Sequence, residues 1–201
     1  DLVLQLDADE VVDKKLGKFV SSINKKIEEL KKDDKDWAKN WKKTNPVAWK
    51  IPRKNLFLGS WLKKGGQYPD PVIRLYINGY AKLPQKDVHE QMKVDGNVGW
   101  AKGHFLHYAN PTFSDYLRKF NTYTKFKAQQ LDEAKTKVSF ANGITYIIFK
   151  PLKTFLQLFV RHRGYVDGIP GFVFAAMSGF HHLVAYLILW EIKEKRKKKN
   201  D

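Results

Sequence analysis

Two aspartates separated by one residue are the strongest candidates for chemistry in this sequence. Asp7 and Asp9 follow the apolar run Leu2–Leu6, which predicts a short buried strand. Because side chains alternate along a strand, both carboxylates are expected on one side, where they could share a hard cation such as Mg²⁺ or Mn²⁺. A cation that bridges a diphosphate acts as a Lewis acid and neutralises charge on the leaving group. The alternative is a pair of solvated acidic residues at a strand end.

The segment around these aspartates resembles a known family. Leu4–Glu10 reads Leu-Gln-Leu-Asp-Ala-Asp-Glu and is similar to the acidic segment of family 2 glycosyltransferases with the GT-A fold. Later segments resemble, in the same order, the bacterial members that are similar to lipopolysaccharide-core sugar transferases. These segments are residues 65–70, 74–76, 88–90, 120–123 and 164–172.

The resemblance implies a role for each candidate residue. Asp7 and Asp9 would hold the divalent cation. An inverting transfer needs a base that takes a proton from the acceptor hydroxyl, and the resemblance points to Glu90 in Val88-His89-Glu90. From the residues alone, the favoured interpretation is that Glu90 is a surface carboxylate and His89 a structural hydrogen-bonding group. A zincin motif is excluded, since position 93 is Lys.

Four residues are expected to contact donor or acceptor: Tyr68, Asp70, Arg74 and His89. Arg74 lies on a predicted strand after a glycine-rich loop and could bind a phosphate or carboxylate of the substrate. A structural salt bridge between Arg74 and Asp70 is the alternative.

The resemblance also implies a fold. We expect an α/β chain that forms the C-terminal part of a GT-A sheet with packed helices. Residues 1–110 are expected to form a partial catalytic domain, and residues 111–201 a helical, membrane-facing extension. A buried strand at residue 1 suggests that the chain starts within a domain, so we expect it to lack the family's nucleotide-binding half.

The pattern of apolar residues places these elements. Helical spacing predicts a helix over 13–32, then a helix continuation or a second short helix in 33–43. Strands are predicted at 47–51, 56–58, 72–77 and 98–108, and a helix over 115–135 capped by Thr112 or Ser114. Residues 144–162 are strongly apolar, with Pro151 as a kink or break.

Charge and composition limit the possible partners. The chain of 201 residues carries a formal charge of +16 and contains no cysteine, so disulfides and thiolate metal sites are excluded. The apolar stretch 172–190 is followed at once by a run of lysines, a pattern typical of an anionic membrane surface. Interfacial insertion is preferred over a span because glycines and a histidine pair interrupt the stretch. A buried core helix with a charged tail is the alternative.

These observations predict a metal-dependent transferase at the cytoplasmic face of a membrane. Its partners would be a nucleotide-sugar donor, a lipid-linked or lipopolysaccharide-type glycan acceptor and anionic lipid. The competing interpretations are a non-enzymatic nucleic-acid-binding module, supported by charge and interleaved aromatics, and a membrane-peripheral scaffold. Nucleic acid is the less expected partner, because the basic residues gather around no recognisable nucleic-acid fold.

Overall fold

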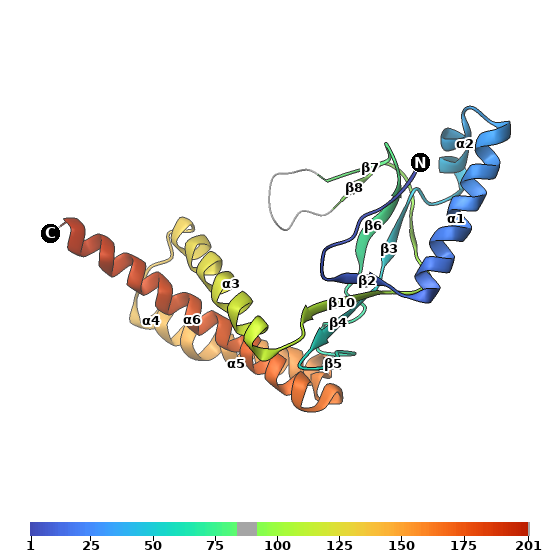
Figure 1. The fold of residues 1–201 in the computed structure, drawn as a ribbon. Coiled ribbons are helices and arrows are strands. Elements are labelled where there is room, and N and C mark those ends of the chain that lie inside the picture. The colour runs from blue at the N-terminus through green and yellow to red at the C-terminus, as the bar shows by residue number, and fades with distance from the viewer. Residues whose placement is uncertain (84–91, 201) are drawn as a thin grey trace. The chain divides into compact units, whose positions relative to one another are not determined.

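The computed structural model describes residues 1–83 and 92–200, which form a mixed α/β structure (Figure 1). The chain divides into two compact units. Unit 1 comprises Asp1–Asn55 and Tyr68–Tyr108, and unit 2 comprises Leu56–Gln67 and Ala109–Asp201. The expected division at residue 110 differs from this one because the segment Leu56–Gln67 joins the helical unit.

The first sheet of unit 1 has the strand order β1-β6-β3-β9. Its strands are β1 (Leu2–Leu4), β6 (Val72–Ile77), β3 (Ala48–Ile51) and β9 (Val98–Trp100). The pairs β1–β6 and β3–β6 are antiparallel, whereas β3–β9 is parallel. Strand β6 spans the predicted residues, while β1 ends two residues earlier than expected.

The second sheet has the order β2-β10-β4-β5, and a two-stranded hairpin forms the third. The strands of the second sheet are β2 (Glu10–Val12), β10 (Phe105–Asn110), β4 (Arg53–Phe57) and β5 (Ser60–Trp61). The hairpin consists of β7 (Ala81–Lys82) and β8 (Lys93–Val94). The single strand predicted over 98–108 is wrong: it is split into β9 and β10. Gly103 lies in the break with a φ of 106°, a conformation that side chains other than glycine's rarely adopt.

Two helices complete unit 1. α1 (Lys14–Asp33) begins at Asp13, whose carboxylate accepts a hydrogen bond from the Leu16 amide, and α2 (Trp37–Thr44) is a separate second helix. Their apolar faces pack against the first sheet. The fully buried side chains of this core include Leu16, Ile27, Val47, Ile51, Leu75, Ile77 and Phe105. This core holds β1, β3 and β6 in place beside the segment that contains Asp7 and Asp9.

Unit 2 is mainly helical. Thr112, one of the two predicted caps, caps α3 (Phe113–Glu133), which begins two residues earlier than predicted. Residues 140–161 follow as one continuous helical segment: α4 (Phe140–Ile144), the π-helical turn η1 (Thr145–Phe149), α5 (Lys150–Leu156) and the π-helical turn η2 (Gln157–Arg161). Pro151 lies in the first turn of α5, directly after a π-helical turn, and the helical segment continues through it, so of the predicted kink or break the break is not present.

The long helix α6 (Gly168–Asn200) follows the short 3₁₀ turn η3 (Gly164–Asp167) and packs between α3 and α5 (Figure 1). Gly179 allows this close packing, because a Cβ atom there would lie 2.6 Å from the carbonyl oxygen of Pro151. Within the described residues, Gly164–Lys199 is the one helical segment long and apolar enough to cross a membrane.

The segment Leu56–Gln67 is held to these helices by polar and aromatic contacts. The amides of Lys63 and Lys64 donate to the two carboxylate oxygens of Asp167, at 3.0 and 2.8 Å. The ring of Phe57 packs edge-on against Tyr116 and Phe174. These contacts explain why this segment belongs to unit 2.

Candidate functional site

The acidic segment forms a tight turn between β1 and β2. Asp7 follows the end of β1, Asp9 lies in the turn and Glu10 is the first residue of β2. The Glu10 amide donates to the Asp7 carbonyl at 3.1 Å, and the Asp7 amide donates to Glu10 Oε2 at 3.2 Å. Turn geometry, rather than the alternation of a strand, therefore sets the directions of the two aspartates.

Asp7 is bound by an arginine from the first sheet. Arg74, in β6, donates from Nη1 and Nη2 to the two carboxylate oxygens of Asp7, each at 2.8 Å. This pair of hydrogen bonds lowers the pKa of Asp7 and raises that of Arg74. The alternative bridge between Arg74 and Asp70 is not formed.

Asp9 lies beside a histidine of β10. Its carboxylate is 3.5 Å from His107 Nε2, and its carbonyl accepts from the Tyr108 amide at 2.8 Å. His107 Nδ1 lies 2.6 Å from Asn55 Oδ1, and that hydrogen bond orients the ring. The Asp9 side chain is 39% exposed.

Arg53, on β4, joins the remaining acidic residues. Its guanidinium bonds Asp70 Oδ2 from Nη2 and Nε, at 2.8 and 3.1 Å, and lies 3.6 Å from Glu10 Oε1. Asn55 donates to the same Asp70 oxygen at 2.9 Å. The Glu10 side chain is fully buried, and its Oε1 accepts no hydrogen bond from the residues that the structure describes.

These contacts define one network, which we call the acidic network. Its members are Asp7, Asp9, Glu10, Arg53, Asn55, Asp70, Arg74 and His107. Four carboxylates against two guanidiniums leave a formal charge of −2 when the histidine is neutral. A site with this charge and oxygen donors suits a hard divalent cation.

Tyr68 belongs to a separate hydrogen-bonded group in unit 1. Its hydroxyl lies 2.9 Å from His104 Nε2, and His104 Nδ1 lies 3.1 Å from Asp13 Oδ2. Asp13 is also the N-cap of α1. Tyr68 therefore contributes to the positioning of that helix.

The structure brings together most of the candidates from the sequence. Asp7, Asp9, Asp70 and Arg74 all lie in the acidic network, whereas His89 and Glu90 fall outside the described residues. Sequence reasoning did not select Arg53, Asn55 or His107 for the site. The available signal was the i, i+2 spacing of Arg53 and Asn55, which places two polar side chains on one face of a strand.

The acidic network offers few donors that are placed for the cation that the resemblance implies. Within residues 1–83 and 92–200, no three His, Asp or Glu side chains are placed to hold a metal ion together. Asp9 is 39% exposed and lies beside His107, so its carboxylate is the accessible candidate ligand of the network. Both carboxylate oxygens of Asp7 accept hydrogen bonds from Arg74. Asp7 fits as a second ligand if one oxygen binds the cation while the Arg74 hydrogen bonds remain, or if the cation replaces Arg74.

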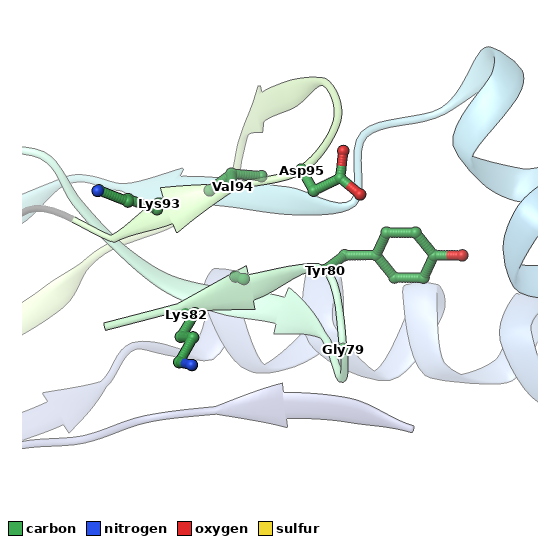
Figure 2. A pocket seen from close by; sticks show the side chains of 7 residues that line it. Gly79, Tyr80, Lys82, Lys93, Val94 and Asp95 are labelled. Atoms are coloured by element: carbon green, nitrogen blue, oxygen red, sulfur yellow. The ribbon is translucent and has the colours of Figure 1, made fainter. Parts of the chain in front are cut away.

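A shallow hollow lies on the β7–β8 hairpin of unit 1 (Figure 2). Its volume is about 440 Å³, and its lining includes Tyr80, Lys82, Lys93 and Asp95. Tyr80 and Asp95 lie toward one end of the hairpin. Lys42 of α2 binds Asp95 at 2.7 Å and lies over the Tyr80 ring, which fixes that end. In the sequence, the candidate base Glu90 lies between these two strands.

In comparisons with known proteins, no family model matches this chain, and no solved structure matches it. The features that bear on the function of this chain are therefore the sequence resemblance and the acidic network.

Proposed function

We propose that this chain is the acceptor-side part of a family 2 glycosyltransferase with a GT-A fold. It would transfer a sugar, with inversion, from a nucleotide-diphosphate donor to a lipid-linked or lipopolysaccharide-type glycan at the cytoplasmic face of a membrane. The observation that carries the proposal is the acidic network, whose four carboxylates and two arginines leave a formal charge of −2. This charge supports one Mg²⁺ or Mn²⁺ held by Asp9 and Asp7.

Each residue then has a defined task. When bound, the cation supplies positive charge to the leaving diphosphate. Arg74 neutralises Asp7 before the cation and donor arrive, and its planar guanidinium suits a diphosphate oxygen afterwards. Arg53 holds Asp70 and the buried Glu10 and so keeps the turn in shape. Glu90 takes the proton from the acceptor hydroxyl.

Manganese binding to this chain tests the cation site without any donor. We expect Asp9→Asn to weaken Mn²⁺ affinity at least tenfold in a titration followed by electron paramagnetic resonance. Arg74→Gln should strengthen it, because the network then becomes more negative and Asp7 loses its competing partner. The matched control is Asp36→Asn, which removes an exposed carboxylate that pairs with Lys39 in unit 1. Equal affinity in all four proteins would refute the site.

Turnover tests the reaction itself. In the family that the chain resembles, residues before the Asp-x-Asp segment hold the nucleotide, so the assay uses the gene product with any residues that precede Asp1. Glu90→Gln should lower kcat by at least a hundredfold and leave Mn²⁺ affinity unchanged. Loss of both properties together would assign Glu90 to structure rather than to proton transfer.

A further inference from the structure

One face of the helical segment 140–161 exposes a row of apolar side chains. Ile148, Leu152, Leu156 and Val160 are spaced four residues apart and are 54, 53, 47 and 55% exposed. Spacing of four places them along one stripe of the helix. In a core helix such a stripe would be covered, but within the described part of unit 2 neither α6 nor α3 covers it.

A polar and basic row runs beside the apolar one. Lys153, Gln157 and Arg161 are each one position further along the helix than Leu152, Leu156 and Val160, and all three are exposed. The surrounding sequence is basic throughout. Residues 134–166 contain six lysines and arginines and no aspartate or glutamate; these are Lys135, Lys137, Lys150, Lys153, Arg161 and Arg163.

We propose that this face of unit 2, the apolar row with its basic neighbours, lies in the plane of an anionic lipid leaflet. The apolar row enters the boundary between headgroups and acyl chains, and Lys153 and Arg161 contact lipid phosphates. We call this surface the α5 face. It differs from the sequence expectation, which placed the membrane contact on residues 172–190 of α6.

Packing and charge select this orientation. If the segment 140–161 crossed the bilayer, Lys150 and Lys153 would lie near the hydrocarbon centre, where charged side chains are strongly disfavoured. An in-plane helix lets both ammonium groups remain at the headgroups. Gly179 of α6 packs closely against the Pro151 carbonyl, while the apolar row of the segment stays about half exposed.

Charge complementarity selects lipid over a second copy of this chain. Two α5 faces in contact would bring like-charged lysine and arginine rows together with no acidic residue to pair them. Anionic headgroups instead offer the opposite charge along the whole row.

An apolar hollow in unit 2 lies next to the same face. It has a volume of about 500 Å³, and Ile148 belongs both to its lining and to the apolar row. The other lining residues include Val138, Phe140, Ile144, Tyr186 and Trp190. Phe140 is highly exposed at its edge, and the lining is almost wholly apolar. A hollow of this kind suits one acyl chain of a leaflet lipid.

Vesicle flotation tests the α5 face without donor or cation, so its result is independent of the proposed transferase activity. Wild-type chain is floated with vesicles of neutral phosphatidylcholine, alone or with a third of phosphatidylglycerol. We expect binding to the anionic vesicles that is reduced at least tenfold by the double substitution Leu152→Gln and Leu156→Gln. Both side chains are half exposed, so circular dichroism should show an unchanged helix content.

Matched variants locate the contact. Lys153→Gln with Arg161→Gln should weaken binding to anionic vesicles about tenfold or more, with little effect in high salt. Leu187→Gln removes an exposed leucine of α6, and Leu30→Gln one of unit 1. Both should bind like wild type. A loss with Leu187→Gln and none with the leucine pair on α5 would overturn the proposal in favour of α6.

Two further outcomes would also overturn it. Equal binding of wild type to neutral and anionic vesicles in low salt would contradict the role of the basic row. A wild-type dimer in light scattering that Leu152→Gln with Leu156→Gln converts to a monomer would assign the face to a second copy.

Discussion

Arg74 donates two parallel hydrogen bonds to the carboxylate of Asp7, each 2.8 Å long, across the gap between β6 and the acidic turn. This geometry fixes one of the two aspartates before any ligand is present. The two residues are 67 positions apart in the sequence, so the pair depends on the sheet order that places β1 beside β6.

The first prediction concerns the titration of Asp7. Because the Arg74 hydrogen bonds lower its pKa below the usual 3.8, the pair stabilises unit 1 above that pH, and the contribution is lost as the pH falls through the lowered value. Arg74→Gln should move the pKa of Asp7 back upward in a carbon-detected NMR titration. The Asp7 side chain is 45% exposed, so the cost in stability at pH 7 should be about 1 kcal/mol or less. An unchanged midpoint would show that the pair does not persist in solution.

A larger effect is expected at Arg53, whose partner Glu10 is fully buried. Arg53→Met removes the guanidinium that lies 3.6 Å from this carboxylate and should cost about 3 kcal/mol. Adding Glu10→Gln should recover part of this loss, because the buried charge is then removed. Hydrogen exchange of the β3 and β6 amides measures the free energy of unfolding of unit 1 separately from unit 2.

The control for Arg53 is a pair on the surface of the same unit. Lys39→Met breaks the exposed bridge to Asp36 and should change the free energy of unfolding by less than about 0.5 kcal/mol. If Arg53→Met cost no more than Lys39→Met, the buried pair would have no structural role.

Asp13 is expected to stabilise α1 in a pH-dependent way. Burial raises its pKa, but hydrogen bonds from the Leu16 amide and from His104 outweigh that effect, so the pKa is lowered overall. The stabilisation is therefore present above the usual value of 3.8 and disappears as the pH falls through the lowered pKa. Asp13→Ala should cost about 1 kcal/mol at pH 7 and less at pH 3, measured by exchange of the α1 amides.

Two substitutions separate capping from charge. Asp13→Asn keeps an acceptor for the helix amide and should cost less than Asp13→Ala. Asp36 precedes α2 but its side chain makes no capping hydrogen bond, so Asp36→Ala should have little effect on stability. A pH-independent penalty for Asp13→Ala would contradict the titration.

Much of the secondary structure could be predicted from the sequence because it depends on local periodicity. The helix expected over 13–32 is confirmed at Lys14–Asp33, and the strand 72–77 is confirmed without change. The break between β9 and β10 could not be predicted in this way. It depends on Gly103, where a Cβ atom would lie 2.2 Å from the Leu16 amide nitrogen, far earlier in the chain.

The candidate site was predictable only in part, for a similar reason. Acidic residues at the end of an apolar run are visible in one sequence, and Asp7 and Asp9 were selected on that basis. The other members Arg53, Asn55 and His107 join the acidic network through the order β2-β10-β4, which periodicity does not specify. The metal and catalytic roles of the site stay predictions.

The last prediction concerns two glycines of the segment 164–172. Gly164 and Gly171 make a close backbone contact, because a Cβ atom on Gly171 would lie 2.0 Å from the carbonyl oxygen of Gly164. Gly171→Ala must therefore push η3 away from the first turn of α6 and should lower stability by about 3 kcal/mol. Gly143 in α4 is the control: a Cβ atom there would meet no described atom within 4 Å, so Gly143→Ala should stabilise the helix by up to about 1 kcal/mol. Hydrogen exchange of the α5 and α6 amides measures the change in the free energy of unfolding of unit 2 for both variants. If the two alanines had equal effects, the close approach of η3 to α6 would be absent in solution.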